Sequence, residues 1–176
     1  MLFRSMLLLI VYVDDLVITG SNSSLIDKIK RSLLKEFDMK DLGQLHYCLG
    51  IEVWRNENSL FLTQAKYVKE LLEKSEMMDS KPLPTPMEVN EKLTTNEHGK
   101  KVDGTIYRQL VGSLIYATIT RPDLSFSITV LSQYMADPKE SHLKAAKRVL
   151  RYLKGTFNYG IEYVSACDLT LHGYCD

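Results

Sequence analysis

The chain has 176 residues, 45% of them hydrophobic, and its 22 basic residues are balanced by 22 acidic ones. This composition is not that of an obviously disordered chain, and it suffices for one globular domain or two small subdomains. The balanced charge excludes a general attraction to polyanions, so any such attraction has to come from local clusters of charge. The cysteines, Cys48, Cys167 and Cys175, are odd in number and widely spaced, which fits neither a disulfide framework nor a zinc site and predicts a reducing compartment.

The chain begins with an apolar run that ends at two adjacent aspartates. The segment 1–13 faintly resembles a signal peptide, but it has no small-residue cleavage site and is shorter than the ~20 apolar residues of a membrane span. We therefore predict a buried strand at 7–13, no membrane association, and an intracellular protein, cytoplasmic or nuclear, that is not secreted. A second apolar run at 16–19 predicts a β-hairpin with Asp14 and Asp15 as its loop, because aspartate tolerates the positive φ of tight turns.

A helix, two strands and a second helix are predicted after this hairpin. Ser24 is expected to cap a helix that extends to about Phe37, with apolar residues at helical spacing. Alternation of apolar and polar residues predicts one half-buried strand over 45–54, and a short strand is predicted at 60–62. Thr63 is expected to begin the second helix. Its predicted inner face consists of Tyr67, Val68, Leu71 and Leu72.

The second half of the chain is predicted to be mainly helical. The stretch 79–104 contains three prolines and no sustained period, so it predicts a long irregular connection. Helices are predicted at 107–119 and 124–135, joined by TRPD at 120–123. A final strand is predicted within 169–176.

A third helix of this half is predicted with Asp137 as N-cap, Pro138 as first residue and Gly155 as C-cap. Its basic residues lie opposite an apolar stripe at helical spacing: Lys144, Lys147, Arg148, Arg151 and Lys154. Such a face could follow a phosphate backbone without reading base sequence, or it could be an ordinary solvated face. Both interpretations stay open from the residues alone.

The adjacent aspartates also allow two interpretations. Ionised neighbours repel each other, and removing either from water without a partner costs several kcal/mol. The turn either projects into solvent, where aspartate is common, or holds a cation. A hard divalent ion such as Mg²⁺ takes oxygen ligands and leaves positions open for water and substrate phosphates, which suits phosphoryl transfer.

Five stretches, in the same order along the chain as in a known family, support the cation interpretation. Tyr12 to Asp15 read YVDD, which resembles the catalytic motif of reverse transcriptases. LGIEV followed by LTQAKYVKELLEK, YRQLVGSLIYATITRPDLSFSITVLSQYM and HLKAAKRVLRYLKGT resemble the polymerase of copia-type LTR retrotransposons, part of a Pol polyprotein. The resemblance implies an RNA-directed DNA polymerase that adds deoxynucleotides to a primer 3′ end with two Mg²⁺ or Mn²⁺ ions. Its implied partners are an RNA/DNA template–primer duplex and deoxynucleotides.

The resemblance also assigns residues and regions. Asp14 is implied as a direct metal ligand and Asp15 as a supporting one, with Tyr12 and Val13 near the primer terminus. The implied fold is α+β: a partial polymerase palm, with the catalytic hairpin, a helix and strands, followed by a mainly helical thumb and connection. The implied regions are 1–63, palm; 64–104, thumb helix and irregular linker; 105–164, helical connection; and 165–176, the start of a truncated ribonuclease H domain.

Only 13 residues precede Asp14 and Asp15, whereas the family places its fingers and a further metal-binding aspartate before this hairpin. Asp176 matches the first catalytic acid of ribonuclease H, a vestigial site here because its other acids would follow. We therefore expect the 176 residues to be inactive alone. The alternative is a non-catalytic retroelement remnant that binds nucleic acid through the basic helix.

Three further features receive structural or mixed interpretations. In TRPD, Arg121 is expected to bridge the joint and Asp123 to lie in the first turn of the next helix. The four histidines share no ligand spacing, so zinc is not expected. Tyr47 and Trp54 are expected either to pack in the core or to touch a primer strand, because the family's primer-contacting hairpin lies near them. Gly50, on the face of Trp54, is expected to leave room for a backbone approach.

Overall fold

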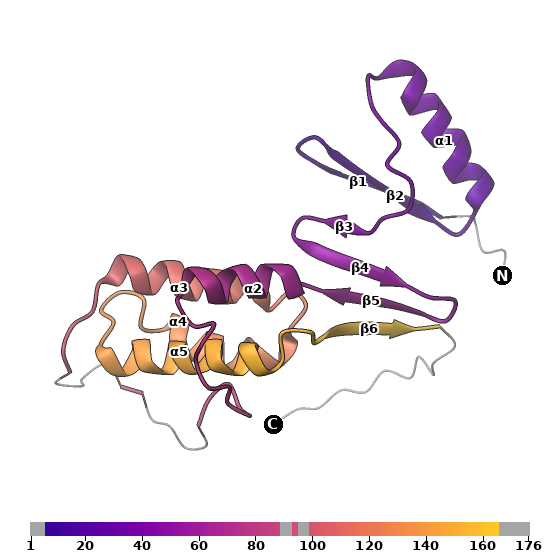
Figure 1. The fold of residues 1–176 in the computed structure, drawn as a ribbon. Coiled ribbons are helices and arrows are strands. Elements are labelled where there is room, and N and C mark those ends of the chain that lie inside the picture. The colour runs from indigo at the N-terminus through magenta and orange to yellow at the C-terminus, as the bar shows by residue number, and fades with distance from the viewer. Residues whose placement is uncertain (1–5, 89–92, 95–98, 166–176) are drawn as a thin grey trace, which may run out of the picture. The chain divides into compact units, whose positions relative to one another are not determined.

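The computed structural model describes residues 6–88, 93–94 and 99–165. The predicted strand at 169–176, with Asp176, lies outside these residues. Helices and antiparallel sheets together make an α+β fold, as the sequence predicts (Figure 1). The chain divides into two compact units, 1–46 and 47–176, which we describe separately.

The first unit is a hairpin with one helix. Strand β1 (Leu7–Tyr12) pairs antiparallel with β2 (Asp15–Gly20), and Tyr12 lies opposite Asp15. The predicted loop is therefore wrong by one residue: Val13 and Asp14 form the turn, and Asp15 already belongs to the second strand. The positive φ of the turn, 51°, falls on Val13.

The predicted burial of the first strand is also wrong within this unit. Leu8 is 50% exposed and Val11 67% exposed. The reason is that the helix of this unit, α1 (Ser23–Glu36), packs mainly on β2, so it does not cover the side chains of β1. Asn22, not Ser24, caps this helix, because its Oδ1 accepts hydrogen bonds from the backbone N–H of Leu25 and the hydroxyl of Ser24.

The second unit contains an antiparallel sheet in the order β3-β4-β5-β6. Its strands are β3 (Tyr47–Cys48), β4 (Ile51–Arg55), β5 (Ser59–Thr63) and β6 (Gly160–Val164). The single strand predicted over 45–54 is wrong: it is a hairpin whose two-residue turn, Leu49 and Gly50, has φ values of 49° and 78°. Two successive positive φ values suit a tight hairpin turn, so Gly50 and Trp54 do not share one continuous strand.

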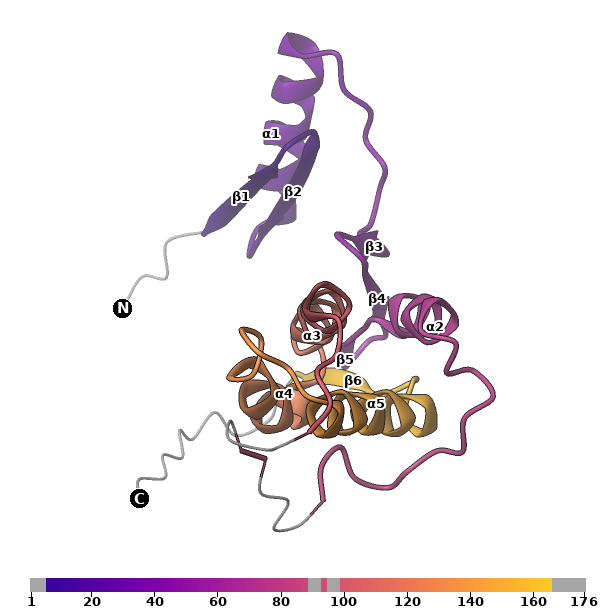
Figure 2. The ribbon, with the colours of Figure 1, turned by 90° about the vertical axis from the view of Figure 1, so that its left-hand side faces the viewer.

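Four helices and a short 3₁₀ segment build the core of this unit, and Figure 2 views the helices nearly end-on. They are α2 (Ala65–Lys74), α3 (Gly104–Ala117), η1 (Pro122–Leu124), α4 (Ser125–Ser132) and α5 (Glu140–Gly155). The apolar stripes of these helices face one another. The core includes Val68, Leu71, Leu72, Tyr107, Val111, Leu114, Leu131, Val149, Leu150 and Leu153. Three of the four predicted inner-face residues of α2 are in this core, and Tyr67 packs against it.

Two predicted helix starts are shifted. Thr63 ends β5, and α2 begins at Ala65. Helix α5 begins at Glu140 rather than Pro138, because Lys139 is still extended and forms a β-bridge with Lys101. Lys139 is the N-cap in place of Asp137, and its backbone N–H donates to Nδ1 of buried His142 at 3.0 Å. The carboxylate of Asp137 instead pairs with Lys139 Nζ at 2.7 Å.

Candidate functional site

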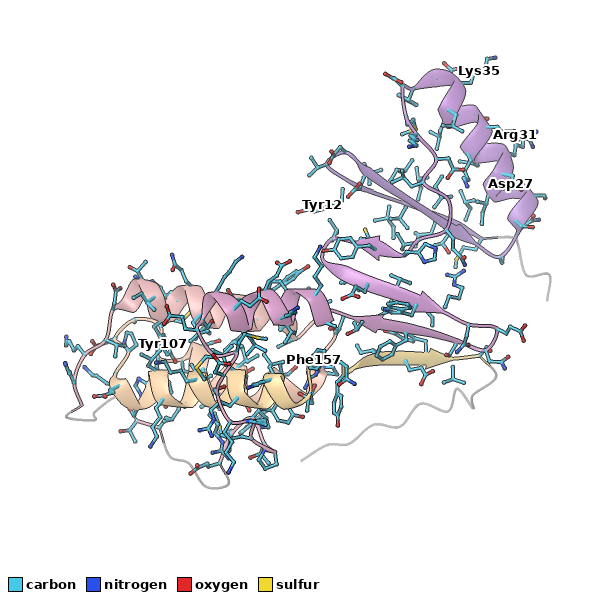
Figure 3. The ribbon with its side chains drawn as sticks, viewed as in Figure 1. Tyr12, Asp27, Arg31, Lys35, Tyr107 and Phe157 are labelled. Carbon is cyan, nitrogen blue, oxygen red and sulfur yellow. The ribbon has the colours of Figure 1, made fainter. Side chains whose placement is uncertain are left out.

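The first candidate site is the turn between β1 and β2. Asp14 and Asp15 are both exposed, and the ladder between the strands ends at the pair Tyr12 and Asp15. Figure 3 labels Tyr12 at the end of β1. Since the turn has only two residues, the six-pair ladder fixes the backbone on both sides of Asp14. The two carboxylates are therefore held at one place on the hairpin.

Val13 gives this turn a strained backbone. It is 85% exposed and has a φ of 51°, a region that a β-branched residue rarely adopts. Such a conformation costs on the order of 1–3 kcal/mol and persists only where the surrounding structure imposes it. Here the paired strands impose it. This strain was not predictable from the sequence, because aspartate was the better candidate for a positive φ.

The two carboxylates fit a cation of high charge. Among the described residues, no basic side chain forms an ion pair with either of them. The part of the chain that the structure describes also holds no group of three metal-ligating side chains. Mg²⁺ is commonly bound through one or two carboxylates, with water and substrate phosphates as its remaining ligands. Asp14 and Asp15 match that donor set.

The second candidate site is the basic face of α5, which partly contacts the chain itself. Residues 80–88, hereafter the strap, run along this helix (Figure 1). Arg148 Nη1 donates to Glu88 Oε1 at 2.6 Å, and its Nη2 donates to Thr85 Oγ1 at 3.0 Å. Arg151 Nε donates to the carbonyl of Lys81 at 2.6 Å. These arginines hold the strap in place.

The remaining basic residues divide between the strap and the surface. Lys154 Nζ donates to the carbonyl of Ser80 at 2.6 Å and is half-buried. Lys144 and Lys147 are exposed. The structure therefore brings three of the five predicted residues onto the strap and leaves two at the surface.

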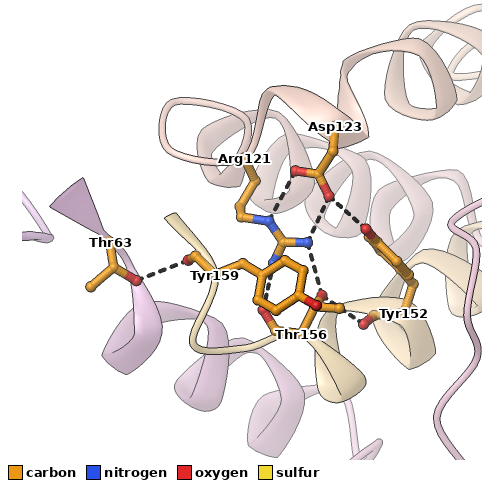
Figure 4. A network of polar contacts seen from close by, with 6 residues as sticks. All are labelled: Thr63, Arg121, Asp123, Tyr152, Thr156 and Tyr159. Atoms are coloured by element: carbon orange, nitrogen blue, oxygen red, sulfur yellow. Dashed lines mark hydrogen bonds and ion pairs between the residues drawn. The ribbon is translucent and has the colours of Figure 1, made fainter. Parts of the chain in front are cut away.

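The TRPD joint is a structural network (Figure 4). Arg121 is only 2% exposed, and its Nε and Nη2 donate to the two carboxylate oxygens of Asp123 at 3.0 and 2.7 Å. Its Nη1 donates to the carbonyl of Thr156 at 2.8 Å, and Nη2 also donates to the Thr156 hydroxyl. The rings of Tyr152 and Tyr159 lie 5.4 Å from the guanidinium. Arg121 thus bridges the joint through Asp123, as the sequence predicts, and it also joins the joint to the end of α5, which the sequence did not predict.

The charge on Asp123 is stabilised by this network. Burial by itself raises the pKa of Asp123, but hydrogen bonds from Arg121 and Tyr152, with the Arg121 charge, outweigh it and hold the pKa below its ordinary value. Burial and the hydrogen bond to Asp123 raise the pKa of Tyr152.

The turn between β3 and β4 is held by a residue that the sequence did not single out. The hydroxyl of Tyr116 donates to the carbonyl of Leu49, and a Cβ at Gly50 would collide with that hydroxyl. The room expected beside Gly50 is thus filled by a side chain rather than by backbone. Tyr47 and Trp54 are both exposed, at 53% and 63%, so neither is part of the core.

Comparisons with known proteins place this geometry in context. A family model described as reverse transcriptase (RNA-dependent DNA polymerase) matches residues 3–89. No helix among the described residues is both long and apolar enough to cross a membrane. No solved structure gave a significant match to the chain.

Three curated relatives match almost the whole chain. It is 44% identical over 173 residues, 98% of its length, to the retrovirus-related Pol polyprotein from transposon RE1 of Arabidopsis thaliana, and spans 12% of that protein. It is 38% identical, over 98% of its length, to the Pol polyprotein from transposon TNT 1-94 of Nicotiana tabacum, of which it spans 14%. It is also 38% identical to an uncharacterized mitochondrial protein of Arabidopsis thaliana, of which it spans 70%.

Proposed function

Because the chain belongs to the reverse transcriptase family of copia-type Pol polyproteins, we propose that its residues take part in RNA-directed DNA synthesis. The observation that carries the proposal is the tight turn of β1 and β2, which holds two exposed carboxylates side by side. The proposed partners are an RNA/DNA template–primer duplex and deoxynucleotides. The proposed regions of the polymerase are those that the resemblance implies, with 1–63 as palm and 105–164 as connection.

Asp14 and Asp15 would hold divalent Mg²⁺ or Mn²⁺. When bound, such ions activate the attacking oxygen of the primer and stabilise the leaving oxygen of the nucleotide. Asp14, inside the turn, is the proposed direct ligand, and Asp15, fixed in the strand ladder, supports it. Tyr12 and Val13 flank the carboxylates and would border the primer terminus. In this proposal, the backbone conformation of Val13 determines the direction in which the adjacent Asp14 side chain leaves the turn.

We propose that the 176-residue chain alone does not polymerise deoxynucleotides. The resemblance implies a further metal-binding aspartate, and the described residues supply no third ligand to this turn. A primer-extension assay on a homopolymer template is expected to give no incorporation. Magnesium-dependent incorporation that disappears in Asp14→Asn would overturn this part of the proposal and support the polymerase activity itself.

Metal binding at the turn is tested separately from turnover. In an NMR titration of the 176-residue chain, paramagnetic Mn²⁺ is expected to broaden amide signals around Asp14 and Asp15, because relaxation falls steeply with distance from the ion. Asp14→Asn should weaken this broadening strongly. Asp27→Asn, which removes an exposed carboxylate of α1 in the same unit (Figure 3), should leave it unchanged. Broadening that is indifferent to Asp14→Asn would contradict the assigned ligands.

A second candidate function is non-catalytic binding of nucleic acid by α5. It is supported by the exposed side chains of Lys144 and Lys147. Duplex binding should weaken with salt, and Lys144→Glu with Lys147→Glu should reduce the salt slope by roughly 2, since each phosphate contact contributes about 0.9. Lys69→Glu, an exposed position on α2, is the matched control. Absence of binding at low salt would contradict this function.

A further inference from the structure

The strap presents one threonine in the setting that a protein kinase requires. Thr85 is exposed and belongs to no helix or strand. Thr85 precedes Pro86, and it is the one serine or threonine in the whole sequence that is followed by proline. Prolines also stand at 82 and 84, so the segment favours the extended conformation in which a kinase binds its substrate.

A receptor for the product of such a modification lies against Thr85. Arg148 Nη2 is 3.0 Å from Thr85 Oγ1, and Glu88 occupies Nη1. The Nε atom of Arg148 is buried and has no hydrogen-bond partner among the described residues. Nε and Nη2 form one edge of the guanidinium, which is the edge that binds a phosphate or carboxylate through two parallel hydrogen bonds. Nη2, which contacts Thr85, therefore shares an edge with a donor that no described residue uses.

We propose that Thr85 is a phosphorylation site for a proline-directed protein kinase and that Arg148 binds the resulting phosphate. In the reaction, Thr85 Oγ attacks the γ-phosphorus of ATP and forms the new Oγ–P bond. The bond between that phosphorus and the β–γ bridging oxygen breaks, ADP leaves with the bridging oxygen, and the hydroxyl proton passes to a base of the kinase.

The product fits the contacts already present. A phosphothreonine carries about 1.5 to 2 negative charges and three acceptor oxygens near neutral pH. Two of these oxygens can accept from Arg148 Nε and Nη2, while Glu88 stays on Nη1. Arg151, one turn along α5, already holds the strap through the Lys81 carbonyl. Phosphorylation would therefore fasten the strap more tightly to α5.

The first part of the test asks whether the site is modified. The 176-residue chain is incubated with a proline-directed kinase and ATP, and phosphate is located by mass spectrometry. Incorporation is expected at Thr85 and should be lost in Thr85→Ala and sharply reduced in Pro86→Ala. No phosphate at Thr85 would overturn the proposal.

The second part asks whether Arg148 binds the phosphate. In a ³¹P NMR titration, the second pKa of phosphothreonine, about 6 when free, is expected to fall by roughly one unit beside the guanidinium. Arg148→Gln should abolish the fall, whereas Lys147→Gln on the same helix should retain it. If Arg148→Gln fails to fold, Arg148→Lys decides, because its compact charge should give a smaller fall. Equal titration curves in the wild type and the Arg148 variant would overturn the assigned receptor.

Discussion

Replacing Arg121 by methionine tests how far one buried cation stabilises the helical part of this fold. Methionine keeps an unbranched apolar stem of similar length and removes the guanidinium. The change leaves the carbonyl of Thr156 and the carboxylate of Asp123 without the donors that now lie at 2.7 to 3.0 Å. Thr156 is buried, whereas the Asp123 side chain is 37% exposed.

The magnitude follows from this difference in exposure. Removing one partner of a buried ion pair costs about 3–5 kcal/mol because the other charge stays buried. Asp123 can regain part of its hydration, which places the loss at the lower end. We expect the free energy of unfolding to fall by about 3 kcal/mol, equivalent to roughly 10 °C in Tm for a chain of this size.

Urea titration measures the loss. Far-UV circular dichroism follows the helices, and the fluorescence of Trp54, the one tryptophan in the sequence, follows the sheet. The matched control is Arg108→Met, because Arg108 is an exposed helical arginine with hydrogen bonds to Met135 and Thr105. A loss below about 1 kcal/mol for Arg121→Met, equal to that of the control, would refute the reasoning.

The same network predicts a pH dependence with a definite sign. The pKa of Asp123 is lower in the folded chain than its ordinary value of 3.8, since the hydrogen bonds from Arg121 and Tyr152 outweigh burial. A carboxyl of this kind stabilises the fold at pH values above its unfolded pKa, and the contribution is lost as pH falls through the folded pKa. The stability difference between the wild type and Asp123→Asn should therefore shrink from about pH 5 downward. A difference that grows on acidification would contradict this sign.

Four further substitutions test backbone and packing. Gly50→Ala should destabilise the second unit by about 2 kcal/mol, since φ is 78° and the new Cβ would meet the Tyr116 hydroxyl; Gly112→Ala, with open space around it, should stabilise by up to about 1 kcal/mol. Val13→Asn should increase amide-exchange protection in the first hairpin by about 1 kcal/mol, because asparagine tolerates positive φ. Leu114→Ala, at a fully buried position, should cost about 2–5 kcal/mol in urea titration.

Each of these has a result that would count against it. Equal effects of Gly50→Ala and Gly112→Ala would mean that the Leu49–Gly50 turn imposes no backbone constraint. Unchanged or weaker protection in Val13→Asn would mean that Val13 stores no strain. A cost for Leu114→Ala no greater than that of Ile115→Ala, at an exposed position of the same helix, would contradict the core.

The helices were the most predictable part of the fold. The period of apolar residues found α2 and its buried face, and it found the helices on both sides of TRPD, because burial of one stripe dominates their energetics. Their ends were less predictable. The start of α5 depends on a bridge between Lys139 and Lys101, two residues far apart in sequence whose pairing no local pattern reveals.

Turns caused the larger errors. Apolar and polar residues alternate from Leu45 to Trp54, yet the chain reverses its direction at Leu49 and Gly50. Because the alternation continues through a two-residue turn, it does not reveal the reversal. The apolar runs on both sides of Asp14 and Asp15 correctly predicted a hairpin, but the register that places Val13 at positive φ is set by strand pairing. Strand β6 was not predicted, because it is defined by pairing with β5, and helices α2 to α5 separate the two strands in the sequence.

The distance between β5 and β6 in the sequence has a consequence for synthesis of the chain. Thr63 and Tyr159, which join the two strands through a hydrogen bond, are 96 residues apart. At about 5–20 residues per second, a ribosome needs roughly 5 to 20 s to supply the second strand after the first. During that interval, one edge of Ser59–Thr63 has unpaired backbone groups and can pair with another nascent chain. Because β6 is synthesised late, β5 edges of chains on adjacent ribosomes of one messenger RNA can pair with each other. A chaperone that covers β5 would shorten the time for which this edge is exposed.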